Sequence, residues 1–245
     1  MKKVISMKKV ISIMTIAFAS IFAFAQTENK AVAQQTQTTA QTDKADANVT
    51  PAQVKNNTSL GVNYVGAGMS LTFVDGTNGM TGYVEGNYNV FKNNTEKFVV
   101  DIYGNVSYSD ISVQNFGFDV SVVPSYNVYT CPGGADVKVF ADVGIGYGST
   151  WFGSTRDDLK SSLTYHGGAG VELSYNIVYL KPYYSYMNIE PFNSYDTISF
   201  NQLGLEAGVA ATEKVDVIGG YYRAFADTKY IDDEDVIFAG IRYKF

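Results

Sequence analysis

The stretch Phe98-Val99-Val100-Asp101-Ile102-Tyr103-Gly104-Asn105-Val106-Ser107-Tyr108 decides the fold class. Its even positions are apolar or glycine, while from Asp101 onward its odd positions carry a carboxylate, a phenol, an amide and a hydroxyl. An alternation with a period of two predicts a β-strand with two different faces. The run is longer than the roughly 5 or 6 residues usual in soluble strands. It suits a strand that crosses a membrane at a tilt, which needs about 9–11 residues.

The same alternation recurs through most of the chain after residue 60. It predicts ten strands, near residues 60–74, 80–91, 98–110, 116–129, 137–150, 163–175, 177–190, 197–210, 215–227 and 235–245. An even number brings both ends of a bacterial barrel to the periplasmic side. The segments 60–74 and 197–210 alternate imperfectly, so an eight-stranded barrel is the alternative.

The polar face of these strands distinguishes a membrane barrel from a soluble one. It is rich in Gly, Ser and Asn with scattered charges, whereas a face in bulk water would carry a dense coat of Lys and Glu. We therefore predict an all-β, transmembrane, antiparallel up-and-down β-barrel whose polar face lines the lumen. Aromatic residues near the strand ends predict two belts, one of Phe91, Phe98, Tyr129, Tyr175, Tyr179, Tyr243 and Phe245 and one of Phe73, Tyr108, Phe116, Trp151, Phe152 and Phe200.

Composition excludes several other classes. Only 17% of the 245 residues are charged, against about 25% in soluble domains. The net charge of -6 argues against a nucleic-acid partner. The single cysteine excludes an internal disulfide. No apolar run long enough for a transmembrane helix occurs beyond the amino terminus.

The chain divides into three parts. Residues 1–25 form the expected signal peptide, with four lysines among the first nine residues, the apolar stretch Val10–Phe24 and cleavage after Ala25. Residues 26–59 are rich in Gln, Thr, Ala and Asn and contain no aromatic residue or glycine, which predicts a disordered periplasmic leader. Residues 60–245 form the expected outer-membrane barrel.

This last part resembles the small bacterial outer-membrane barrels of the opacity and porin-like family. The resemblance rests on the export signal, on Gly- and aromatic-rich hairpins such as Asn63–Met69, and on the final strand Val236–Phe245. Family members end on an aromatic residue with apolar residues at alternate positions before it, here Phe245, Tyr243 and Ile241. The resemblance implies that the barrel-assembly machinery recognises this end. It transfers no catalytic or ligand-binding residue.

Charged residues at lumen-facing positions are the candidate functional set. They carry both signs, which predicts a network of paired structural groups in a narrow lumen. A barrel of ten strands lies close to the size that its own side chains fill, and a polar path for small solutes is the alternative. The set comprises Glu85, Asp101, Asp119, Asp142, Glu172, Lys138, Lys181, Arg242 and Lys244.

We expect a non-catalytic outer-membrane barrel with a structural or small-solute, porin-like role. One alternative is a surface protein that binds a partner through its external loops, whose acidic residues would also favour cations at a channel mouth. A third class is a barrel enzyme acting through His166, the only histidine, with Glu172 six residues further on. We expect no cofactor and no metal. The expected partners are the lipid bilayer, the assembly machinery, and small solutes or surface ligands.

Overall fold

The computed structural model describes residues 56–74, 77–109, 114–151, 159–192, 197–227 and 232–245. The expected signal peptide and the leader up to residue 55 lie outside the described residues and stay predictions. Within the described residues, no helix is long and apolar enough to cross a bilayer.

Ten strands account for nearly all of the described chain. They are β1 Tyr64–Val74, β2 Thr77–Lys92, β3 Phe98–Ser109, β4 Gln114–Thr130, β5 Asp136–Trp151, β6 Leu159–Tyr175, β7 Val178–Pro191, β8 Ile198–Ala210, β9 Val215–Ala226 and β10 Glu234–Lys244. The bounds lie close to those expected, except that β6 begins earlier and β1 begins later. The early start of β6 reflects pairing with β5, which continues to Trp151 opposite Leu159 beyond the alternating stretch.

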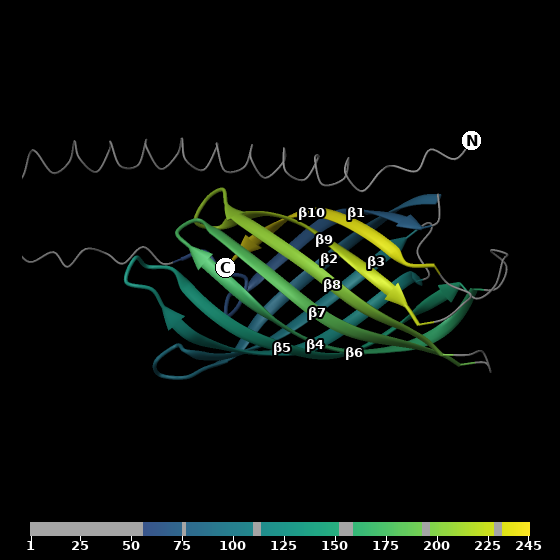
Figure 1. Ribbon diagram of the computed structural model, residues 1–245, viewed down its shortest axis with the longest axis horizontal. Coiled ribbons are helices and arrows are strands. Elements are labelled where there is room, and N and C mark those ends of the chain that lie inside the picture. The colour runs from purple at the N-terminus through teal and green to yellow at the C-terminus, as the bar shows by residue number, and fades with distance from the viewer. Residues whose placement is uncertain (1–55, 75–76, 110–113, 152–158, 193–196, 228–231) are drawn as a thin grey trace, which may run out of the picture. The chain divides into compact units, whose positions relative to one another are not determined.

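The sheet closes on itself without a free edge. Each strand pairs antiparallel with its neighbours in chain order, and β1 pairs with β10 from Tyr64 opposite Lys244 to Phe73 opposite Asp235 (Figure 1). The predicted ten-stranded antiparallel barrel is confirmed, and the eight-stranded alternative is wrong. The start of β1 and the end of β10 lie at the same barrel end as the short turns at 93–97, 131–135, 176–177 and 211–214, which identifies this end as periplasmic.

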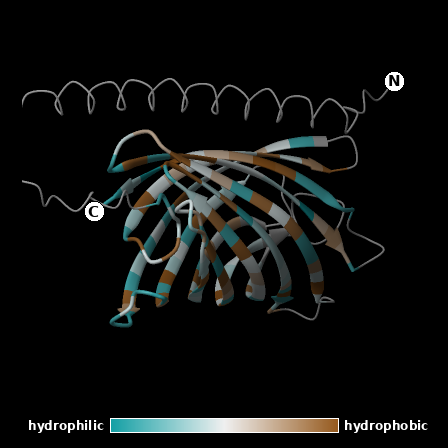
Figure 2. Cartoon of the chain, turned by 60° about the vertical axis from the view of Figure 1, so that its left-hand side comes forward, coloured by the Kyte–Doolittle hydropathy of each residue, from teal (hydrophilic) through white to brown (hydrophobic). Residues whose placement is uncertain are grey.

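The outer wall is apolar. Many outward apolar side chains are strongly exposed, and Val143 near the middle of β5 is 68% exposed. The inward Asp101 and Glu172 are fully buried. Hydrophobic and hydrophilic residues alternate along the strands (Figure 2). An exposed apolar wall around a polar interior is the arrangement that a lipid environment stabilises.

Glycines on the inner wall make room for large side chains lying directly opposite them in the register. Tyr179 lies over Gly208, Tyr183 over Gly204, Phe140 over Gly170, Phe238 over Gly220 and His166 over Gly144. A Cβ atom on any of these glycines would overlap the opposite ring. The inward glycines therefore let large side chains fold flat against the wall and fill the lumen at high density.

Two members of the expected aromatic belts lie inside the barrel instead. Phe200 is 2% exposed and packs with Ile189, Ile198 and Ala224, and Tyr179 is also 2% exposed. The belt assignment is wrong for both residues. At the external end of β8 the usual pattern is inverted, because the outward Ser199 is polar and its hydroxyl donates a hydrogen bond to the side-chain oxygen Oδ1 of Asn188 (2.6 Å). Phe152 lies outside the described residues.

The last residues of the expected leader are ordered, which corrects its boundary. Residues 56–63 enter the barrel at its periplasmic end, and Asn57, Thr58, Ser59 and Leu60 are buried there. This segment has few apolar side chains to bury, and it is held mainly by hydrogen bonds to the barrel wall. Consequently β1 begins at Tyr64 rather than at residue 60.

Candidate functional site: the filled lumen

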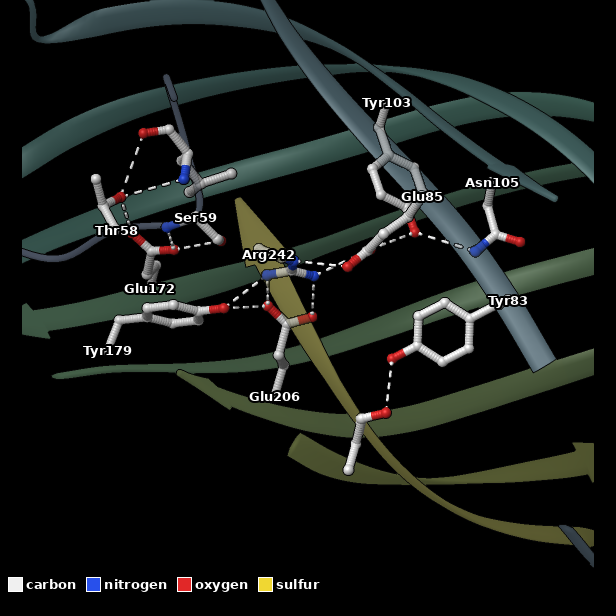
Figure 3. Close-up of polar contacts among 12 residues, drawn as sticks. Thr58, Ser59, Tyr83, Glu85, Tyr103, Asn105, Glu172, Tyr179, Glu206 and Arg242 are labelled. Atoms are coloured by element: carbon white, nitrogen blue, oxygen red, sulfur yellow. Dashed lines mark hydrogen bonds and ion pairs between the residues drawn. The ribbon is translucent and has the colours of Figure 1, made fainter. Parts of the chain in front are cut away.

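Arg242 of β10 joins two glutamates across the lumen. Its guanidinium donates to both carboxylate oxygens of Glu85 on β2, at 2.7 and 3.1 Å, and to both of Glu206 on β8, also at 2.7 and 3.1 Å (Figure 3). A fifth bond, of 2.6 Å, reaches the Tyr179 hydroxyl. Arginine has five N–H donors, so this site uses its full donor capacity. We call Arg242, Glu85, Glu206 and Tyr179 the arginine hub.

Aromatic residues complete the hub. Tyr103 donates to Glu85 (2.9 Å) and Tyr179 donates to Glu206 (2.7 Å). The Tyr64 ring lies 4.6 Å from the guanidinium carbon of Arg242, within range of a cation–π contact. Burying ions is costly unless their hydrogen-bonding groups are matched. Here the match is complete for Arg242, so the hub forms a rigid cross-link between distant strands.

A second closing layer lies at the periplasmic end, where the chain segment Asn56–Gly61 enters the barrel. Glu172 accepts hydrogen bonds from the Thr58 hydroxyl, from the Ser59 backbone N–H (3.0 Å) and from the Ser59 hydroxyl (2.6 Å) (Figure 3). Lys138 Nζ lies 3.9 Å from the Glu172 carboxylate and donates to Thr58 Oγ1 at 2.7 Å. The Gly61 N–H donates to Asp101 at 2.7 Å. Two fully buried carboxylates therefore hold this segment.

The segment also carries one apolar side chain into the lumen. Leu60 packs against Val123 and Phe140, with Tyr103 and Tyr183 beside them. Gly61 adopts a left-handed backbone with φ of 76°, and a side chain there would press on Val99. Glycine is the residue that accepts this conformation without strain. The turn at Gly61 thus carries the chain from the lumen to the start of β1.

Further up the lumen, His166 lies between two carboxylates. Its Nδ1 is 3.2 Å from Asp119 Oδ2, and its Nε2 is 3.1 Å from Asp142 Oδ2. A catalytic histidine needs one ring nitrogen directed at the nucleophile and the other at an orienting acid. Both nitrogens of His166 face acids, and Glu172, proposed as its partner, instead binds Thr58 and Ser59.

A cavity of about 410 Å³ lies above the arginine hub. Asp119, Asp142 and His166 line one part of it, and Ile189 and Phe200 line another. In the part of the chain that the structure describes, no group of three or more His, Cys, Asp or Glu side chains is arranged to hold a metal ion. The sequence-based expectations of no metal and no cofactor stay predictions.

The structure places all nine candidate charges at inward positions of their strands. It brings together Glu85 with Arg242 and Lys138 with Glu172. Asp119 and Asp142 meet through His166, and Asp101 contacts Gly61. The remaining two lysines have other partners: Lys244 forms an ion pair with Asp216 (2.7 Å), and Lys181 lies 4.9 Å from the Phe140 ring centroid.

Sequence reasoning missed Glu206, Asp216 and Tyr179. Asp216 lies in the regularly alternating stretch Val215-Asp216-Val217-Ile218, so the alternation predicts its inward position. Glu206 lies on β8, where the inverted external end obscured the alternation. The importance of Tyr179 depends on the curvature of the sheet, which brings its hydroxyl on β7 to Arg242 on β10 past the two strands between them.

The expected carboxy-terminal signature lies on the outer wall. Ile241, Tyr243 and Phe245 point outward, and Phe245 is 66% exposed. The Phe245 N–H donates to the Asn63 carbonyl (3.1 Å), which ties the last residue to the segment before β1. Recognition by the assembly machinery stays a prediction from the family resemblance.

Comparison with known proteins gives similarity of structure only. No protein-family model matches the sequence. A search of curated proteins also found no match.

Among solved structures, the NanC porin aligns with 11% identity and a TM-score of 0.42 over 75% of this chain and 100% of its own. An outer membrane channel from Pseudomonas putida F1 aligns with 7% identity and a TM-score of 0.41 over 81% and 100%. The outer membrane phospholipase A from Escherichia coli aligns with 11% identity and a TM-score of 0.34 over 82% and 94%.

The closed barrel, its apolar outer wall and its polar lumen define the class of the protein. It is a β-barrel of the bacterial outer membrane, inserted in the lipid bilayer.

Proposed function

We propose that this protein is a non-catalytic structural barrel of the outer membrane whose lumen is closed to solutes as folded. The observation that carries the proposal is Arg242 of β10, which binds Glu85 of β2 and Glu206 of β8 inside the lumen. The segment Asn56–Gly61 adds a second layer below it. A saturated hub and a lumen-filling segment favour a structural role over passive diffusion of small solutes.

The environment of His166 supports the absence of catalysis. Carboxylates face both ring nitrogens at 3.1 and 3.2 Å, so neither nitrogen is directed at a hydroxyl nucleophile. Hydrolysis of ester, peptide or phospholipid substrates by the folded protein, with loss of this activity in His166→Ala, would contradict the proposal.

The adhesion alternative depends on external loops, whose tips lie outside the described residues. It therefore stays a sequence-based hypothesis.

Single-channel recording in planar lipid bilayers tests the closed state. The sample is full-length protein whose folding is verified by heat-shifted gel mobility, and a large open porin serves as the positive control. We expect no conductance steps from the folded protein. Regular steps that disappear after heat denaturation would overturn the closed structural barrel in favour of a porin.

A further inference from the structure

We propose that the segment Asn56–Gly61 is a removable plug that closes a cation path along the inner face of β4, β5 and β6. The proposal goes beyond the structural role and rests on it in one respect, because it takes the closed barrel as the resting state. It adds a second, conducting state of the same protein.

The plug is held outside the strand pairing of the barrel. It lies before β1, and the barrel seam between β1 and β10 begins only at Tyr64. Many of its contacts with the wall are side-chain hydrogen bonds, those of Glu172 and Asp101 among them. Departure of the plug therefore breaks no strand pairing.

The two buried carboxylates that hold the plug have other partners on the barrel wall. Glu172 would keep Lys138 at 3.9 Å, and Asp101 would keep the hydrogen bond of 2.8 Å from the Asn89 amide. Water entering from the periplasm can satisfy the remaining acceptors, as it does for exposed polar groups elsewhere. The barrel can thus stay folded when the plug leaves.

The plug and the arginine hub occupy different sides of the lumen. The arginine hub spans the side of the lumen formed by β7, β8, β10 and β2. Leu60 fills the opposite side, where it packs against Val123 of β4 and Phe140 of β5. Hub and plug are therefore complementary, and removing Leu60 leaves the hub in place while opening the β4–β5 side.

The wall above Leu60 is lined by small residues. Inward positions on β4, β5 and β6 between the plug and the cavity include Gly117, Ser121, Gly144, Gly146 and Gly168. Gly117 also lines the cavity above the hub. The side chains that cover this wall above Leu60 include His166 and Asp142, which fold over Gly144 and Gly168 and also line the cavity.

Acidic side chains outnumber basic ones along this side of the lumen. Four carboxylates face this route, namely Asp119, Asp142, Asp101 and Glu172. Three basic groups face it as well, namely His166, Lys138 and Lys181, which lies over the Phe140 ring. A narrow passage with excess negative charge concentrates cations and excludes anions. The open state is therefore a cation pathway.

The variant Ser59→Asp tests the plug without altering the barrel wall. Ser59 Oγ lies 2.6 Å from Glu172 Oε2, so a carboxylate introduced there is repelled by Glu172 and drives the segment out of the lumen. In planar bilayers we expect wild type to be silent and Ser59→Asp to give conductance steps. With a KCl gradient, the reversal potential should show preference for K⁺ over Cl⁻.

Three further variants define the mechanism. Adding Glu172→Gln to Ser59→Asp removes the repulsion and should return the barrel to silence. Thr95→Asp places the same charge in the exposed turn between β2 and β3, and should leave the barrel silent. Leu60→Ala empties the pocket beside Val123 and Phe140 by a different route, and should also produce steps.

The outcomes separate the two proposals. Conductance by wild type overturns the closed barrel of the proposed function. A silent wild type together with silent, correctly folded Ser59→Asp and Leu60→Ala variants overturns the plug alone, and so do steps that prefer Cl⁻. If Ser59→Asp fails the heat-mobility assay, Leu60→Ala decides the question by itself.

Discussion

The ring of Tyr179 lies flat on Gly208, its register partner across the β7–β8 pair. This contact brings the Tyr179 hydroxyl to Arg242 and Glu206 at 2.6 and 2.7 Å. The absence of a side chain at position 208 is thus a condition for the arginine hub. Several parts of the lumen are built on such glycine–ring pairs.

The substitution Gly208→Ala should destabilise the barrel. The new methyl group overlaps the Tyr179 ring and displaces it from the hub, and overpacking of this kind costs about 1–3 kcal/mol. Denaturant unfolding in detergent micelles, followed by gel mobility, measures the loss. Gly82→Ala is the matched control, because a Cβ there meets open space. Equal stability of the two variants would show that Tyr179 moves without cost.

Replacement of Arg242 by Met should be far more damaging than the same change at Arg223. Arg242→Met leaves Glu85 and Glu206 buried without their cation, which costs about 3–5 kcal/mol. Arg223 instead pairs with Asp233 at 3.2 Å on the exposed wall, where such pairs contribute about 0–1 kcal/mol. The same unfolding assay compares them.

The Arg242 prediction has an internal check. Combining Arg242→Met with Glu85→Gln and Glu206→Gln removes the uncompensated charge, so part of the lost stability should return. A triple variant no more stable than Arg242→Met would mean that the damage comes from lost packing rather than from buried charge.

Deletion of Phe245 should reduce assembly. The deletion removes an outward aromatic ring and, by family resemblance, the signal read by the assembly machinery, so little folded protein should reach the outer membrane. Phe245→Tyr should be tolerated, because the interface accepts another amphipathic aromatic ring. Lys244→Gln, on the lumenal side, should affect insertion far less. Fractionation with heat-shifted gel mobility measures each, and normal outer-membrane levels of the deletion would contradict this role.

A charge on the outer wall should destabilise the barrel according to its depth. Val143 lies near the middle of β5 and is the most exposed of the large outward hydrophobic residues. Val143→Arg should therefore cost about 2–4 kcal/mol when the protein folds into lipid vesicles. Tyr129→Arg, beside the periplasmic end of β4, should cost about 0–1 kcal/mol. Similar costs at both positions would contradict the proposed position of the bilayer.

The sequence alone determined the strands and their faces wherever each strand met one environment on each side. The alternation through Phe98–Tyr108 predicted β3 and its inward Asp101 and Tyr103, because side chains of a strand point to opposite faces in turn. The outward row Ile241, Tyr243 and Phe245 followed from the same local geometry.

The sequence could not decide which residues meet across the lumen. Glu85, Glu206 and Arg242 lie on three strands separated by up to 157 positions, and only closure of the barrel in one register brings them together. For the same reason the choice between eight and ten strands depended on the β1–β10 seam.

Tertiary contacts also overrode composition and local pattern at particular residues. Tyr179 and Phe200 are aromatic residues near strand ends, which is typical of a belt, yet both face inward. Inside the lumen the Tyr179 hydroxyl binds Arg242, and the Phe200 ring packs against Ile189. The segment Asn56–Gly61 has a composition typical of disorder. It is ordered because Glu172 and Asp101, far along the chain, provide the acceptors that offset its loss of conformational entropy.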